Sequence, residues 1–158
     1  GAPHGLRLVG GEALNVLRIG AGFVHWGHDL AYTDAPHQMG LGFVCKTEKT
    51  VPFIGRDAFM ERKTAAQGPF LCSIRLDDPD ALLHHNEPVL RDGEIAGFVT
   101  SGAFSAEVGS AIGLCVISPA EGGARSSVLD GSYAVLVEGR KVPAKIGLKP
   151  INTWGFAG

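Results

Sequence analysis

The feature that most restricts the fold is the stretch from Gly68 onward, which reads as short strands and tight turns without helical segments between them. Within Phe70–Leu76, apolar side chains occupy every second position, the period of a strand with one buried face. Asp92-Gly93 separates Pro88–Arg91 from Glu94–Ser101, and this dipeptide suits the positive φ angles of a type I′ turn. These segments therefore predict antiparallel strands, two of them in a hairpin.

Three further strands follow that hairpin. Ala111–Ile117 predicts one, and Tyr133–Val137 and Val142–Ile146 predict two more that flank the turn-forming pair Gly139-Arg140. Strands that follow one another without intervening helices form antiparallel barrels or sandwiches rather than parallel sheets. We therefore predict an antiparallel β-barrel or sandwich for this part of the chain.

The first part of the chain mixes helical and extended signals. Ala13, Leu14 and Leu17 recur at helical spacing and predict a short amphipathic helix over Glu12–Ile19. A second helix is predicted over Gly55–Thr64, because its first turn is acidic and its last turn is basic, which suits the helix dipole.

Between these helices, the apolar run Leu41–Lys46 predicts a buried strand, and Phe23–Leu30 predicts a loop or irregular strand. The change of texture near residue 67 predicts two parts, residues 1–66 and residues 67–158. The expected fold class is mainly β with a short α+β N-terminal part.

Composition excludes several classes of function. The chain has 14 Lys and Arg against 16 Asp and Glu, which argues against a nucleic-acid binder that works by neutralising phosphates. No apolar run approaches the roughly 20 residues that span a bilayer, so we expect no membrane partner. The three Cys lie in apolar runs and predict buried free thiols in a reducing compartment, the cytoplasm or, in a eukaryote, the mitochondrial matrix.

The densest polar cluster is His25-Trp26-Gly27-His28-Asp29. Its spacing differs from that of the familiar zinc helix, so we expect no metal site there. Two interpretations stay open, in which these side chains either satisfy backbone groups of an irregular loop or contact a ligand through the Trp26 ring. The chain also lacks a phosphate loop and a dinucleotide fingerprint, so we expect no flavin on it.

Arg18 stands in the otherwise apolar run Val16-Leu17-Arg18-Ile19. An arginine in such a position either extends its charged end to solvent or directs its planar fork at a carboxylate. Periodicity alone does not separate the two interpretations.

Taken in order, several segments resemble the C-terminal part of the aminomethyltransferase (glycine cleavage T-protein) family. The likeness is greatest to the folate-dependent tail of dimethylglycine and sarcosine dehydrogenases. The resembling segments are Gly10–Gly22, His25–Leu30, Thr33–Pro36, Gly40–Lys46, Phe53–Ala58, Asn86–Pro88, Arg91–Gly102 and Ala111–Val116.

This resemblance implies that residues 1–66 end a central α+β folate-binding region and that residues 67–158 form the family's C-terminal antiparallel β-barrel. It implies tetrahydrofolate as the cofactor of a one-carbon (aminomethyl) transferase, with FAD only in a separate domain. The family's catalytic Asp lies upstream of the resembling segments, so we expect no catalytic residue here. The expected partner is the remainder of a larger polypeptide or a partner subunit.

The resemblance implies a folate site in this chain and assigns three residues to it. Arg18 matches an arginine associated with that site, where a cation would suit the glutamate tail of folate. Trp26 and His28 match a motif that is expected to shape the cavity wall. Gly20 stands where the family usually has Glu, which favours the alternative of a non-catalytic binding or scaffolding module with the same barrel.

Overall fold

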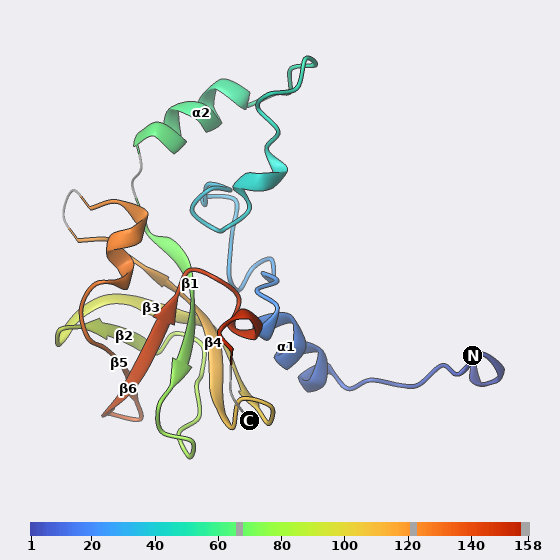
Figure 1. Cartoon of the computed structure of the whole chain (residues 1–158), viewed down its shortest axis with the longest axis vertical. Helices are drawn as coiled ribbons and strands as arrows, with labels where there is room; N and C mark the ends of the chain where they lie inside the picture. The colour runs from blue at the N-terminus through green and yellow to red at the C-terminus, as the bar shows by residue number, and fades with distance from the viewer. Residues whose placement is uncertain (66–67, 121–122, 156–158) are drawn as a thin grey trace.

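Six antiparallel strands close into a barrel in the computed structural model, which describes residues 1–65, 68–120 and 123–155 (Figure 1). Around the barrel the strands follow the order β1-β4-β3-β2-β5-β6. The predicted class, mainly β with an antiparallel barrel, is therefore confirmed. The strands are β1 (Phe70–Leu76), β2 (Pro88–Arg91), β3 (Glu94–Ser105), β4 (Ser110–Ile117), β5 (Tyr133–Val137) and β6 (Arg140–Gly147).

Both predicted hairpins form. Asp92 and Gly93 have φ angles of 53° and 94° between β2 and β3, so both take the left-handed conformation that a type I′ turn requires. In the second hairpin, Glu138 and Gly139 take these positions, with φ angles of 48° and 79°. That turn lies one residue earlier than Gly139-Arg140, and Arg140 begins β6.

The barrel has a packed interior and one covered outer face. Side chains of β1 alternate between the two, because successive residues of a strand point to opposite faces. Phe70 and Cys72 belong to the interior cluster, whereas Leu71 belongs to a second cluster outside the barrel. All eight residues of β4 are buried, so β1 and β4 are covered on both sides rather than on one.

Helix α1 (Gly11–Gly20) and the 3₁₀ helix η4 (Ile151–Thr153) cover this outer face (Figure 1). Ile19 and Ile151 are fully buried there against Leu114 of β4. The predicted extent of the first helix is confirmed, but its predicted buried face is wrong. Leu14 and Leu17 are each 64% exposed, because α1 turns its other side to the barrel.

The remaining N-terminal segments lie outside the barrel. Helix α2 (Arg56–Ala65) confirms the second predicted helix and stands clear of the strands (Figure 1). The predicted strand Leu41–Lys46 is wrong, since Gly42–Val44 is a 3₁₀ helix with exposed Phe43 and Val44. The closed barrel offers no free edge with which such a strand could pair. No helix in the described ranges is long and apolar enough to span a membrane.

We predict that residues 67–158 fold without residues 1–66 but are less stable than the whole chain. The proposed boundary, residues 66 and 67, lies outside the described residues. Truncation would uncover Leu71, Ile112 and Leu114, and full exposure of such a side chain costs about 1.5–3 kcal/mol. Urea unfolding should show a cooperative transition for the shorter chain, at a lower urea concentration than for the whole chain. The absence of a cooperative transition in the shorter chain would show that the boundary is wrong.

The thiols give a second test of the fold. Cys72 and Cys115 are buried opposite each other on β1 and β4, and burial raises the pKa of the Cys72 thiol to about 12 and that of Cys115 well above its usual range. Because the thiolate is the reactive form, a thiol-specific dye at pH 8 should label only the partly exposed Cys45 in the native chain. Denaturant should release the other two thiols, and Cys45→Ser should abolish native labelling. Fast labelling of Cys72 would contradict the closed barrel.

Candidate functional site

A tight turn places the His-Trp-Gly-His-Asp segment beside the barrel. The backbone N–H of Asp29 donates to the carbonyl of His25 at 2.9 Å, and that of Gly27 donates to the carbonyl of Leu30 at 2.8 Å. Gly27 has a φ of 84°, a left-handed conformation that favours glycine. As a result the rings of His25 and His28 stack, with centroids 4.7 Å apart and planes 7° from parallel.

The Asp29 carboxylate is the centre of the site, and its side chain is fully buried. Oδ1 accepts hydrogen bonds from Thr100 Oγ1 at 2.6 Å and from Ser101 Oγ at 2.7 Å. Oδ2 accepts one from the backbone N–H of His25 at 2.8 Å and one from the guanidinium of Arg18. Four donors thus satisfy one buried charge, which is the condition under which proteins tolerate a buried carboxylate.

Most of the N–H groups of the Arg18 guanidinium donate hydrogen bonds within the protein. Nε donates to Asn15 Oδ1 at 2.9 Å, Nη1 to Asp29 and to the Phe23 carbonyl, and Nη2 to Ser101 Oγ at 2.7 Å. Of the five N–H groups of a guanidinium, one on Nη2 has no acceptor among the described residues. Of the two interpretations left open by the sequence, the structure favours the carboxylate partner.

The network ties three distant parts of the chain together. Asp29 comes from the turn after α1, Arg18 from α1 itself, and Thr100 and Ser101 from the middle of β3. Gly20, at the place of the family's usual Glu, packs closely against Asn152, since an added Cβ would lie 2.5 Å from Asn152 Oδ1. Asp29 therefore supplies the acidic partner that Gly20 does not.

A cavity of about 590 Å³ lies beside this network, between α1, the turn, the connection from β1 to β2, and β3. Leu14, Phe23, Val24 and Leu83 give it apolar walls. Its charged or titratable lining groups are Arg18 and four histidines, His25, His28, His84 and His85, with no Asp or Glu among the described residues that line it. A cavity of this volume that combines apolar walls with polar groups is typical of small-molecule sites.

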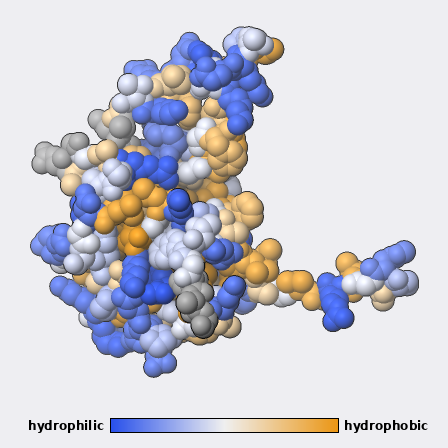
Figure 2. Space-filling model, viewed as in Figure 1, coloured by the Kyte–Doolittle hydropathy of each residue, from blue (hydrophilic) through white to orange (hydrophobic). Residues whose placement is uncertain are grey.

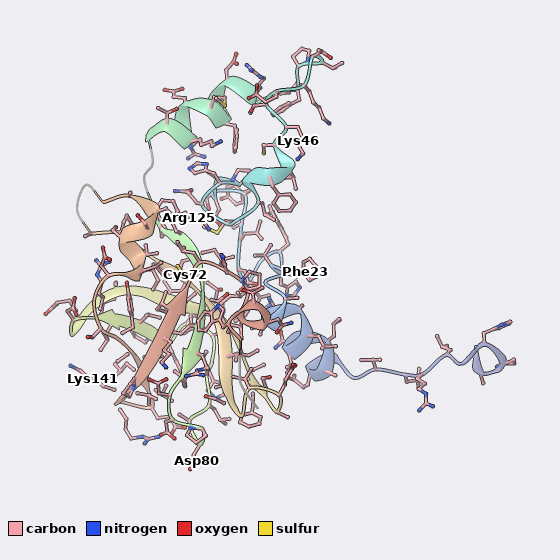
Figure 3. All side chains as sticks on the ribbon, in the orientation of Figure 1. Phe23, Lys46, Cys72, Asp80, Arg125 and Lys141 are labelled. Carbon is pink, nitrogen blue, oxygen red and sulfur yellow. The ribbon has the colours of Figure 1, made fainter. Side chains whose placement is uncertain are left out.

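The structure brings together two of the three residues expected at the folate site. Arg18 and His28 line the cavity, whereas Trp26 is 64% exposed and is not among the lining residues. Phe23 from the same segment lies at the cavity beside α1 (Figure 3). A ligand contact of Trp26 therefore stays a prediction.

Sequence reasoning missed Asp29 as the partner of Arg18, and missed His85 as a wall of the same cavity. The signal for Asp29 was present, because a carboxylate in a turn-forming segment needs several donors when it is buried. His85 gave no such signal, since it stands in a polar connection and its ring reaches Thr100 only through the fold, where Nδ1 lies 2.5 Å from the Thr100 carbonyl.

The cavity combines apolar walls with one cation and four histidines, a combination that suits an anionic ligand with an aromatic or apolar body. Metal binding has no such support, because the described part of the chain holds no group of three or more His, Cys, Asp or Glu that could bind an ion.

We predict that Asp29→Ala lowers the free energy of unfolding by about 3–5 kcal/mol, because it leaves the Arg18 guanidinium without its buried partner. Asp34→Ala is the matched control. Asp34 caps a neighbouring turn through one hydrogen bond from the backbone N–H of Ala31 at 2.6 Å and has no ion pair among the described residues. Urea unfolding should show a smaller loss for the control, about 1.5–3 kcal/mol, and equal losses would contradict the central role of Asp29.

Two family profiles match this chain. The glycine cleavage T-protein C-terminal barrel domain matches residues 70–151, and the GCVT N-terminal domain matches residues 1–49. The crystal structure of glycine cleavage system aminomethyltransferase T from Bartonella henselae superposes with a TM-score of 0.72 over 88% of this chain and 38% of that one, at 18% identity. At this identity the likeness concerns the fold alone.

Three curated relatives are similar over nearly the whole chain. A 4-methylaminobutanoate oxidase (formaldehyde-forming) from Paenarthrobacter nicotinovorans is 34% identical over 95% of this chain. A mitochondrial sarcosine dehydrogenase from Mus musculus is 32% identical over 94%, and an aminomethyltransferase from Geobacillus thermodenitrificans is 33% identical over 92%.

The chain spans only part of each relative, 18% of the oxidase, 16% of the dehydrogenase and 38% of the aminomethyltransferase. The match of the barrel profile runs from the first residue of β1 to the first residue of η4 and so includes all six strands of the closed barrel. On these grounds the chain belongs to the glycine cleavage T-protein family.

Proposed function

We propose that this chain is the C-terminal portion of a tetrahydrofolate-dependent one-carbon (aminomethyl) transferase module. The module would belong to an enzyme like the FAD-dependent dimethylglycine and sarcosine dehydrogenases, with FAD on a separate domain. The observation that carries the proposal is the cavity beside α1, which combines apolar walls with an arginine and four histidines and has no carboxylate among its described lining residues. The oxidase and dehydrogenase relatives support the choice of enzyme class.

Tetrahydrofolate, when bound, supplies the amine that accepts a one-carbon unit. The residues of this chain would bind and orient it rather than react with it. Leu14 and Leu83 offer apolar contact for its rings, and the remaining N–H on Arg18 Nη2 offers one hydrogen bond. His28 would face the ligand from the turn. We assign no catalytic residue to this chain.

The exposed apolar surface supports a larger assembly. Leu8 is 98% exposed, and Phe23 and Ile54 are also exposed. In Figure 2, hydrophobic residues gather along the N-terminal segment and on the side of the molecule from which this segment extends. Apolar patches of this kind mark surfaces that another part of a protein covers. The partner would be the remainder of the polypeptide or a partner subunit.

The test uses the complete polypeptide and 5-formyltetrahydrofolate, a stable relative of the cofactor, with affinity measured by calorimetry. Leu14 and Leu17 lie on the same helix and are equally exposed, but only Leu14 lines the cavity. We predict that Leu14→Glu weakens binding at least about tenfold, because it sets a negative charge beside the anionic ligand. Leu17→Glu should change the affinity by no more than about twofold, which is much less than the effect expected of a charge that lines the cavity.

Both variants should keep the unfolding temperature of the unmodified protein, which controls for general damage. Absence of saturable binding to the unmodified polypeptide would overturn the proposed function. So would equal weakening by the two substitutions, because the site would then not be this cavity.

A further inference from the structure

The charge of Arg18 is already balanced within the protein. Its Nη1 donates to the buried Asp29 carboxylate, and the two side chains form an ion pair with exposed fractions of 15% and 0%. An anionic ligand in the cavity would therefore meet a neutral pair with one spare N–H, not an unbalanced cation. Within this chain, its counter-charge has to come from other lining groups, and the only other titratable side chains among the described lining residues are histidines.

Three of these histidines form a connected cluster. The His25 and His28 rings are stacked at 4.7 Å, and the His28 and His85 rings meet edge to face at 5.5 Å. They come from two separate segments, the turn after α1 and the connection between β1 and β2. All three residues are exposed and line the cavity, so a ligand could contact their ring nitrogens.

The fold fixes the orientation of one ring. His85 Nδ1 lies 2.5 Å from the carbonyl of Thr100, and since a carbonyl only accepts, Nδ1 carries the proton. Thr100 also holds Asp29 through Oγ1, so the same residue positions the ion pair and the histidine cluster.

The charged groups around the cluster already have hydrogen-bond or ion-pair partners, so they do not prevent the histidines from taking up protons. On α1, Arg18 is balanced by Asp29; on the connection before β2, the carboxylate of Glu87 accepts a hydrogen bond from the backbone N–H of His84 at 2.8 Å. Imidazole side chains change charge between pH 5 and 8. Two stacked rings repel each other when both are cations, and a bound anion offsets that repulsion. Anion binding and proton uptake should therefore support each other.

We infer that His25, His28 and His85 form the counter-charge for a carboxylate of the bound ligand, so that binding strengthens as the pH falls through neutrality. The inference rests on the proposed function for the identity of the ligand, a folate whose glutamyl part bears the carboxylates. It assigns the charge recognition to the histidine cluster and leaves Arg18 to hold Asp29.

The experiment measures binding of 5-formyltetrahydrofolate to the complete polypeptide at pH 6 and pH 8 by calorimetry. The comparison ligand is its glutamyl diamide, which has the same shape and no glutamyl carboxylates. Those carboxylates stay ionised at both pH values, so a pH effect reports on the protein. We expect the acid to bind about tenfold or more tightly at pH 6, as linkage to one proton allows, and the diamide to change within twofold.

Calorimetry in two buffers of different ionisation enthalpy should show net proton uptake when the acid binds. Replacing His25, His28 and His85 together by Gln should remove both the uptake and the pH effect, whereas His4→Gln, at the far N-terminal end, should preserve them. Unfolding temperatures check that the exposed substitutions leave the fold intact.

A pH effect that persists in the triple variant, or that is equal for acid and diamide, overturns the inference and leaves the proposed function standing. Tight binding of the acid without any pH effect also overturns the inference and leaves the proposed function standing. If neither ligand binds at either pH, the proposed function fails and the inference fails with it.

Discussion

The buried Asp29 carboxylate is the interaction on which the arrangement of this chain depends. It is the point where α1, the histidine turn and β3 meet, and it accepts four hydrogen bonds, one of them from Arg18. A buried charge of this kind is tolerated only with all its donors in place. The network therefore fixes how the N-terminal segments sit on the barrel, and the cavity beside it exists because they sit there.

The barrel supplies a rigid base for this site on one face only. β4 is buried on both sides because α1 and η4 cover it, whereas the outer face of β6 carries exposed Lys141 and Lys145. The lining of the cavity comes partly from β3 and partly from segments outside the barrel. Ligand binding at this junction would join the two parts of the chain, and the exposed apolar side chains of the N-terminal segment, such as Leu8, leave a further surface for the rest of a larger protein.

Much of the fold could be predicted from the sequence, because its determinants are local. Asp92-Gly93 determines a hairpin by its φ angles, and the alternation of Phe70–Leu76 marks a strand. The errors arose where distant contacts decide the outcome. Leu14 and Leu17 look like a core face but are exposed, since the opposite side of α1 packs on the barrel. Leu41–Lys46 is apolar enough for a strand, yet a closed barrel leaves it no edge. Likewise the unusual position of Arg18 was visible, but its partners Asp29 and Ser101 lie 11 and 83 residues away.

The most direct test is a crystal structure of the complete polypeptide with 5-formyltetrahydrofolate bound at pH 6. This account predicts that Arg18 stays paired with Asp29 and that a glutamyl carboxylate lies within about 3.2 Å of a ring nitrogen of His28 or His85. A structure in which Arg18 leaves Asp29 and pairs with the ligand, with the histidines turned away, would contradict it.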